Sequence, residues 1–72
     1  MSTIRQTHFF KHWFDGLRDI QARARVQVRI DRLERGNPGD VKPVGSGVLE
    51  MRIHYGPGYR VYFKPFGQRI VV

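Results

Sequence analysis

The sequence predicts an α+β fold in which two helices pack on one face of a mostly antiparallel sheet. Two observations support this prediction. Helical spacing of apolar residues dominates the first half of the chain, and alternation of apolar and polar residues dominates the second half. Helices followed by a run of strands are typical of an α+β layer arrangement. The 72 residues are enough for a single domain, so we assign one domain to residues 1–72.

A short strand and an aromatic helix are expected at the N-terminus. Residues 3–7, TIRQT, are interpreted as the strand, and Thr7 is placed as the N-cap of a helix over HFFKHWFDGL. Apolar residues recur in this segment at three- and four-residue spacing and form one stripe along the helix. We assign the whole stripe to the core: Phe9, Phe10, Trp13, Phe14 and Leu17.

The next segment, DIQARARVQVRIDRLERG, fits two patterns. Alternation from Ile20 to Ile30 fits a strand. A helical stripe instead takes Ile20, Ala24, Val26, Ile30 and Leu33. Length favours the helix, because about seventeen residues without a breaker are ordinary for a helix and long for a strand. Asp19 is the expected N-cap, and Gly36 before Asn37-Pro38 is the expected end.

The rest of the chain is expected to form a loop and then strands. Residues 37–47, NPGDVKPVGSG, are interpreted as a loop with a short extended piece at 41–44, because Pro43 is unsuited to a central strand. Alternation predicts strands at 48–55, 59–64 and 68–72. The expected order of elements is therefore β-α-α-β-β-β.

The loop between the first two of these strands decides which residues face one another. A three-residue loop, Gly56-Pro57-Gly58, keeps the apolar residues of both strands on one face. This loop predicts Arg52 opposite Tyr62 and His54 opposite Arg60.

The turn between the strands at 59–64 and 68–72 is predicted from the same alternation. A two-residue loop at Phe66-Gly67 predicts Arg69 beside Lys64 on the polar face. The opposite face is then apolar and is predicted to meet the helices. It consists of Met51, Ile53, Val61, Phe63, Ile70 and Val72.

The polar face is strongly basic. It gathers Arg52, His54, Arg60, Tyr62, Lys64 and Arg69, with Glu50 as the only acid. Neighbouring like charges are destabilising unless an anion offsets them, and the whole chain has a formal charge of +7. We expect this face to contact nucleic acid, with phosphate offsetting the charge and tyrosine contacting a base.

Several classes of protein and site are disfavoured. The chain has no cysteine, so disulfides and thiolate metal sites are excluded. No apolar run approaches the roughly 20 residues of a membrane span, and no secretory signal is evident, so a cytoplasmic protein is expected. His8 and His12 have a spacing that can hold zinc, but a third ligand is not evident. We therefore expect no metal and no cofactor.

Three motifs carry a resemblance to a known family. RLERGNPGD, VKPVGSGVLEMRI and GYRVYF resemble the addiction-module killer proteins, the HigB-like branch of the RelE/ParE toxin superfamily. The resemblance extends over essentially the whole chain. It implies the RelE-like β-α-α-β-β-β fold. It also implies a type II toxin neutralised by a co-encoded antitoxin, usually one with a helix-turn-helix.

The resemblance also implies an activity. Many relatives are ribosome-dependent endoribonucleases (mRNA interferases) that cut mRNA and inhibit translation. Arg60 of the Gly-Tyr-Arg motif corresponds to the residue that contacts the scissile phosphate, and Arg52 falls near a basic catalytic residue. A metal-independent attack by a ribose 2′-OH needs a base, an acid and charge stabilisation. Histidine is a common proton-transfer group, so His54 is expected to be catalytic. The expected substrate-binding residues are Tyr62, Lys64 and Arg69.

Two alternatives remain open. The ParE branch shares the fold but inhibits DNA gyrase, and Arg52 with Arg60 argues against it. The chain is otherwise a truncated or inactive module that binds RNA or the antitoxin. Glu50 favours this third interpretation, because relatives often present a basic group there. The end at Val72 favours it too, because relatives continue into a tail.

Overall fold

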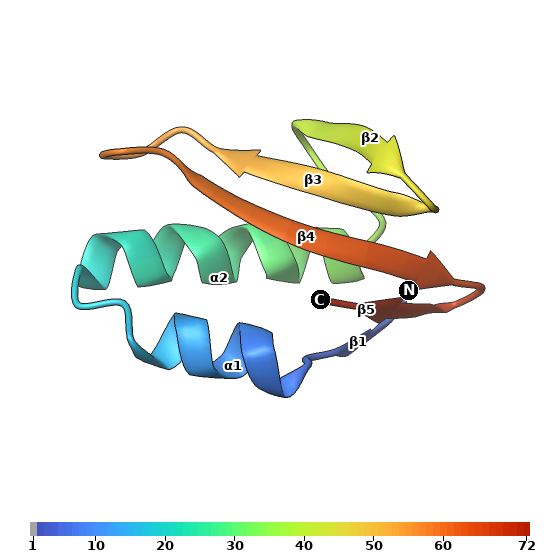
Figure 1. Ribbon diagram of the computed structural model, residues 1–72, viewed down its shortest axis with the longest axis horizontal. Coiled ribbons are helices and arrows are strands. Elements are labelled where there is room, and N and C mark those ends of the chain that lie inside the picture. The colour runs from blue at the N-terminus through green and yellow to red at the C-terminus, as the bar shows by residue number, and fades with distance from the viewer. Residues whose placement is uncertain (1) are drawn as a thin grey trace.

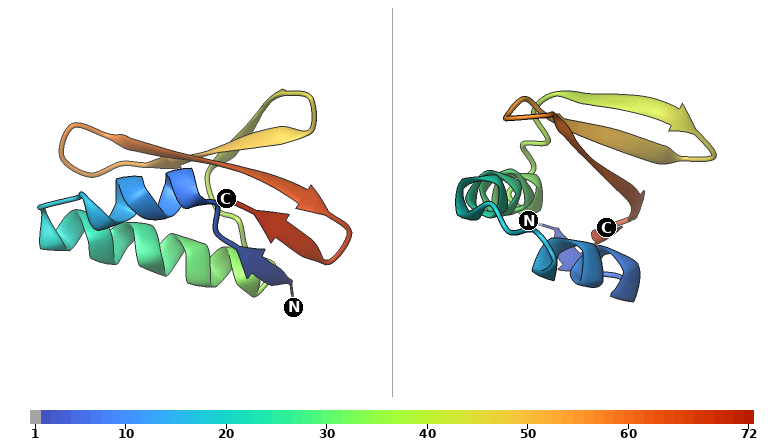
Figure 2. Two further views of the ribbon diagram at one scale, coloured as in Figure 1. Left: turned by 60° about the horizontal axis from the view of Figure 1, so that its bottom comes forward. Right: turned by 60° about the vertical axis from the view of Figure 1, so that its left-hand side comes forward.

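A curled sheet wraps around two helices that lie against one of its faces (Figures 1 and 2). The computed structural model describes residues 2–72. The elements are β1 (Thr3–Arg5), α1 (His8–Asp15), α2 (Ile20–Glu34), β2 (Val41–Gly45), β3 (Val48–Ile53), β4 (Tyr59–Phe66) and β5 (Arg69–Val71).

The strand order in the sheet is β1-β5-β4-β3-β2. β1 and β5 are parallel, and the other neighbouring pairs are antiparallel. The predicted α+β class is therefore confirmed. The short extended piece predicted near 41–44 is a full edge strand, where Pro43 is tolerated. Within residues 2–72, no helix is both long enough and apolar enough to cross a bilayer.

The predicted helix caps are confirmed. The Thr7 hydroxyl accepts a hydrogen bond from the Phe10 amide at 3.1 Å. The Asp19 carboxylate accepts from the amides of Gln21 and Ala22 at 2.9 and 3.2 Å. These bonds satisfy amide groups that the first turn of a helix leaves without partners. α2 ends just before Gly36, whose φ of +88° suits glycine.

The predicted inner face of the sheet is also confirmed. Met51, Val61 and Phe63 are buried beneath the helices, as are the other inner-face residues. α2 contributes one side of its surface to this core: Ala22, Val26, Ile30 and Leu33. The helical interpretation of this segment is thus right. Its stripe is partly wrong, because Ile20 and Ala24 are exposed and Ala22 is buried instead.

The prediction that every aromatic residue of α1 belongs to the core is wrong. Phe10 is buried, and Phe14 packs partly against the core. Phe9 is 85% exposed and Trp13 is 36% exposed. Successive helical residues are rotated by about 100°, so a short helix resting on one edge of the sheet cannot bury Phe9 together with Phe10.

The two neighbouring phenylalanines should therefore differ sharply in their contribution to stability. Phe10→Ala is expected to lower the free energy of unfolding by about 3–5 kcal/mol, because it removes a buried aromatic ring. Phe9→Ser is expected to change it by less than about 0.5 kcal/mol. Urea unfolding of both variants tests this, and similar losses in the two would contradict the assigned burial.

The predicted register of the β3–β4 hairpin is wrong by two residues. Arg52 lies opposite Arg60, and Glu50 lies opposite Tyr62. The loop has five residues instead of three, because Tyr55 leaves the strand. Its hydroxyl donates to the Asp19 carboxylate at 3.1 Å. A shift of two residues preserves the faces, which is why the core was predicted correctly although the partners were not.

The turn between β4 and β5 is shifted in the same way. The two-residue loop is Gly67-Gln68, so Arg69 lies opposite Phe66 and Lys64 lies opposite Val71. The predicted contact between Arg69 and Lys64 is therefore wrong. Gly67 has a φ of +59°, which places the left-handed residue first in the loop.

Candidate functional site

Two arginines face each other on the exposed side of the β3–β4 hairpin. Arg52 and Arg60 are direct cross-strand neighbours. Cβ atoms of such neighbours lie about 4.5–5.5 Å apart, so the guanidinium groups repel unless acids lie nearby. The structure therefore brings the two predicted catalytic arginines together more closely than the predicted register did.

Asp40 partners one of these arginines. Its Oδ1 accepts from Arg52 Nη2 at 2.8 Å, and its Oδ2 lies 2.7 Å from His54 Nε2. The hydrogen bonds from His54 and then Arg52 lower the pKa of the Asp40 carboxyl below its usual range. Sequence patterns did not indicate Asp40. The pairing of Val41 with Met51 is the signal that would have placed it beside Arg52.

The lowered pKa of Asp40 predicts a specific pH dependence. A carboxyl with a lowered folded-state pKa stabilises the fold at pH values above its unfolded pKa, and this contribution is lost as the pH falls through the folded value. Asp40→Asn should therefore lower the melting temperature at neutral pH and flatten its decline in acid. Calorimetry between pH 7 and pH 2 tests this, and parallel curves for the two proteins would contradict it.

His54 lies beside Arg52, because both side chains bind the Asp40 carboxylate. It follows the last residue of β3, and its side chain is 77% exposed. It lines a hollow of about 340 Å³ beside α2, together with Arg25 and Arg32. The structure therefore does not place His54 opposite Arg60, and its closest polar partner is Asp40.

Glu50 is the buried acid of the otherwise basic face. The residue is 8% exposed. Its Oε2 accepts from the Tyr62 hydroxyl at 3.2 Å and lies 3.7 Å from Arg60 Nη1. Glu50 therefore links Tyr62 and Arg60 in one polar cluster. Among residues 2–72, the buried side-chain atom without a hydrogen-bond partner is Nε of Arg52.

An aromatic hollow of about 370 Å³ adjoins Arg60. Phe9 and Trp13 of α1 line one side, and Tyr62 of β4 lines the other. Tyr62 is half exposed. Two of these rings were predicted to be core, so this surface was not predicted. Counting helical rotation from the Thr7 cap is the signal that could have revealed it.

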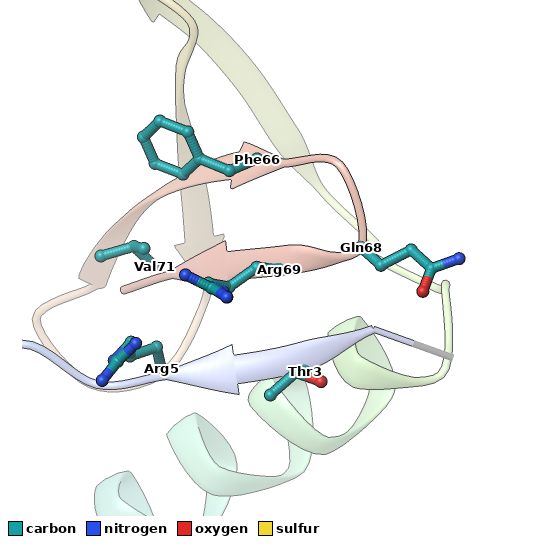
Figure 3. Close-up of a pocket in the computed structure, with 6 residues that line it drawn as sticks. All are labelled: Thr3, Arg5, Phe66, Gln68, Arg69 and Val71. Atoms are coloured by element: carbon teal, nitrogen blue, oxygen red, sulfur yellow. The ribbon is translucent and has the colours of Figure 1, made fainter.

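Lys64 and Arg69 lie further along the sheet. The Lys64 ammonium lies 5.2 Å from the centre of the Phe66 ring. The lysine stem crosses close to Gly47, where a Cβ would come within 3.1 Å of Lys64 Cε. Arg69 lies on β5 beside β1 (Figure 3), away from Arg52 and Arg60 along the sheet.

Arg29 connects α2 to the candidate site. Its guanidinium donates to the backbone carbonyl of Arg52 at 2.6 Å. It also donates to the carbonyls of Pro38 and Asp40 at 3.1 and 3.3 Å. These contacts hold the loop that carries Asp40 against the helix.

The two helix histidines have few partners. The rings of His8 and His12 stack on α1 with centroids 6.4 Å apart. Within the described residues, no three histidine, aspartate or glutamate side chains come together as metal ligands do.

A protein of Haemophilus influenzae, described as uncharacterized, is 46% identical over 61 residues, which are 85% of this chain and 62% of the relative. The chain thus spans less than two thirds of the relative's length. No family model matches the chain, and no solved structure matches it.

Proposed function

We propose that this chain is a HigB-like toxin of the RelE/ParE superfamily that cuts mRNA on the ribosome. The observation that carries the proposal is the pair of arginines facing each other on the exposed side of the β3–β4 hairpin. The order of helices and strands, β-α-α-β-β-β-β, is the order expected for a RelE-like fold with one further strand, β2. The proposed partners are a co-encoded antitoxin and the ribosome with its mRNA, in the cytoplasm.

A phosphodiester suits the Arg52–Arg60 pair. Guanidinium groups bind phosphate through two parallel hydrogen bonds, which lysine cannot do. The Arg52 side chain is 39% exposed, so a phosphate oxygen can reach the outer part of its guanidinium. Asp40 and Glu50 neutralise the two arginines in the free protein, and the substrate would compete with these carboxylates for them.

The proposed reaction is cleavage by the neighbouring ribose hydroxyl. The 2′-oxygen attacks phosphorus as a base removes its proton, and the 5′-oxygen leaves as it gains a proton. The products are a 2′,3′-cyclic phosphate and a 5′-hydroxyl. Arg60 and Arg52 would stabilise the charge on the phosphoryl oxygens in the transition state.

Proton transfer is assigned from the contacts of each group. Glu50 lies beside Arg60 and is the better placed base, whereas His54 is engaged by Asp40. Tyr62 donates a hydrogen bond to Glu50 and also lines the aromatic hollow. The nucleobase next to the scissile phosphate would therefore stack in that hollow. His54 would need to leave Asp40 to act as the acid.

Induced expression distinguishes this function from the two alternatives. Rapid loss of amino-acid incorporation before any DNA-damage response is expected for the nuclease. A gyrase inhibitor would trigger the DNA-damage response first, and an inactive module would leave growth unchanged. Either of those results would overturn the proposal.

A further inference from the structure

A second pair of arginines lies at the other end of the same sheet face. Arg69 on β5 pairs with Thr3 of β1, and Arg5 pairs with Val71. Both arginines therefore project from the same side of neighbouring strands, and Figure 3 shows the two guanidinium groups close together. They line a hollow of about 640 Å³ with Thr3, Phe66, Gln68 and Val71.

This pair differs electrostatically from the first. Arg52, His54 and Arg60 each have a carboxylate partner within 4 Å. Within the described part of the chain, Arg5 and Arg69 form no ion pair, and the hollow that they line contains no acid. Arg5 and Arg69 are diagonal neighbours on adjacent strands, so their like charges repel unless an anion binds between them. The hollow therefore favours an anionic ligand.

An exposed aromatic ring and a third cation complete the surface. Phe66 lies opposite Arg69 and is 53% exposed, although its ring is large and apolar. The Lys64 ammonium lies 5.2 Å from that ring. An anion-binding hollow bordered by a half-exposed aromatic ring suits a nucleotide, because phosphate binds the guanidinium groups and the base stacks on the ring.

We propose that the hollow between Arg5 and Arg69 binds a phosphodiester of single-stranded RNA, with the adjoining base against Phe66. The site continues the surface of the first arginine pair, because Arg60, Tyr62, Lys64 and Phe66 alternate along the same face of β4. Phe66 follows Arg60 by six positions on β4, which corresponds to about 20 Å along the strand. The identification of the ligand as RNA rests on the proposed function. The inference that the hollow binds a polyanion rests on its charges alone.

Salt-dependent RNA binding tests this site. Binding of a labelled single-stranded RNA is measured by fluorescence anisotropy at several salt concentrations, in an Arg60→Ala background that limits cleavage. Adding Arg5→Gln and Arg69→Gln should reduce the slope of log K against log salt by about 0.7, since the two arginines share one phosphate and each lost phosphate contact removes about 0.7. The matched control replaces two exposed arginines outside the hollow, Arg18→Gln and Arg35→Gln. Equal slopes in the two double variants would overturn the proposal.

The aromatic contact has its own test. Phe66→Leu is expected to weaken RNA binding at least several-fold, because stacking of one base is worth about 1–3 kcal/mol. Binding of inorganic polyphosphate, which has no bases, should stay unchanged. Unchanged RNA binding, or equal weakening for both ligands, would contradict the assigned role of Phe66. Urea unfolding of each variant shows that the compared proteins are folded, since all the replaced side chains are exposed.

Failure of this site and failure of the proposed function give different results. If the wild type does not cut RNA but the Arg5 and Arg69 changes reduce the slope, the nuclease is wrong and the binding site stands. If the wild type cuts RNA and the slope is unchanged, the binding site is wrong and the nuclease stands.

Discussion

An Arg60→Ala variant is expected to cut ribosome-bound mRNA about 10²–10³-fold more slowly than the wild type. The guanidinium would stabilise charge that develops on the phosphoryl oxygens, and removing one such donor costs a rate factor of this size. The effect should fall on kcat more than on KM, because the interaction strengthens in the transition state. Steady-state cleavage in a reconstituted translation mixture measures both quantities.

Two further variants make the Arg60 result interpretable. Arg60→Lys keeps the positive charge but loses the two-pronged geometry, so it should bind substrate normally and recover little of the rate. Arg18→Ala removes an exposed arginine outside the candidate site and should leave the rate unchanged. The Arg60 side chain is 64% exposed, so its loss should alter folding little. Cleavage by Arg60→Ala at the wild-type rate would contradict the assigned role.

Arg29→Met is expected to destabilise the fold by about 3 kcal/mol. The change removes three hydrogen bonds from a charged donor to backbone carbonyls, while the methionine keeps much of the apolar stem. A chain of this length has about 4–11 kcal/mol of unfolding free energy, so the loss is a large share of it. Urea unfolding of the variant measures the change.

Arg32→Met is the matched control for Arg29→Met. Arg32 lies on the same helix and is exposed, and its side chain forms no hydrogen bond within residues 2–72. Its replacement should change stability by less than about 0.5 kcal/mol. Arg29→Lys should resemble the methionine variant, because one ammonium group cannot reach three carbonyls in a fixed fork. Equal stability of all three variants would show that the Arg29 contacts do not hold the Asp40 loop.

The sequence predicted the fold class, the helix caps and the inner face of the sheet. Each of these depends on local chemistry or on periodicity. A threonine or an aspartate directly before a helical apolar stripe is a typical N-cap, which is enough to place Thr7 and Asp19. Alternation with a period of two is enough to turn Met51 and Val61 inward.

Periodicity could not determine the strand partners. A shift of two residues preserves the faces, so alternation cannot distinguish Arg52 opposite Tyr62 from Arg52 opposite Arg60. The contact of Tyr55 with Asp19 selects the second register, and it joins residues 36 positions apart. The acid partners of the site follow from that register and from the β2–β3 pairing. Asp40 and the role of Glu50 were therefore not predictable from spacing alone.

The chemistry of the RNA ends tests the central claim most directly. Total RNA from a translation mixture is treated with the wild type or with Arg60→Ala, and the new ends are identified by end-specific ligation and sequencing. Cleavage by the ribose hydroxyl predicts 2′,3′-cyclic phosphate and 5′-hydroxyl ends within translated mRNA, greatly reduced with Arg60→Ala. New ends bearing a 3′-hydroxyl and a 5′-phosphate, or arrested translation with no new ends, would contradict it.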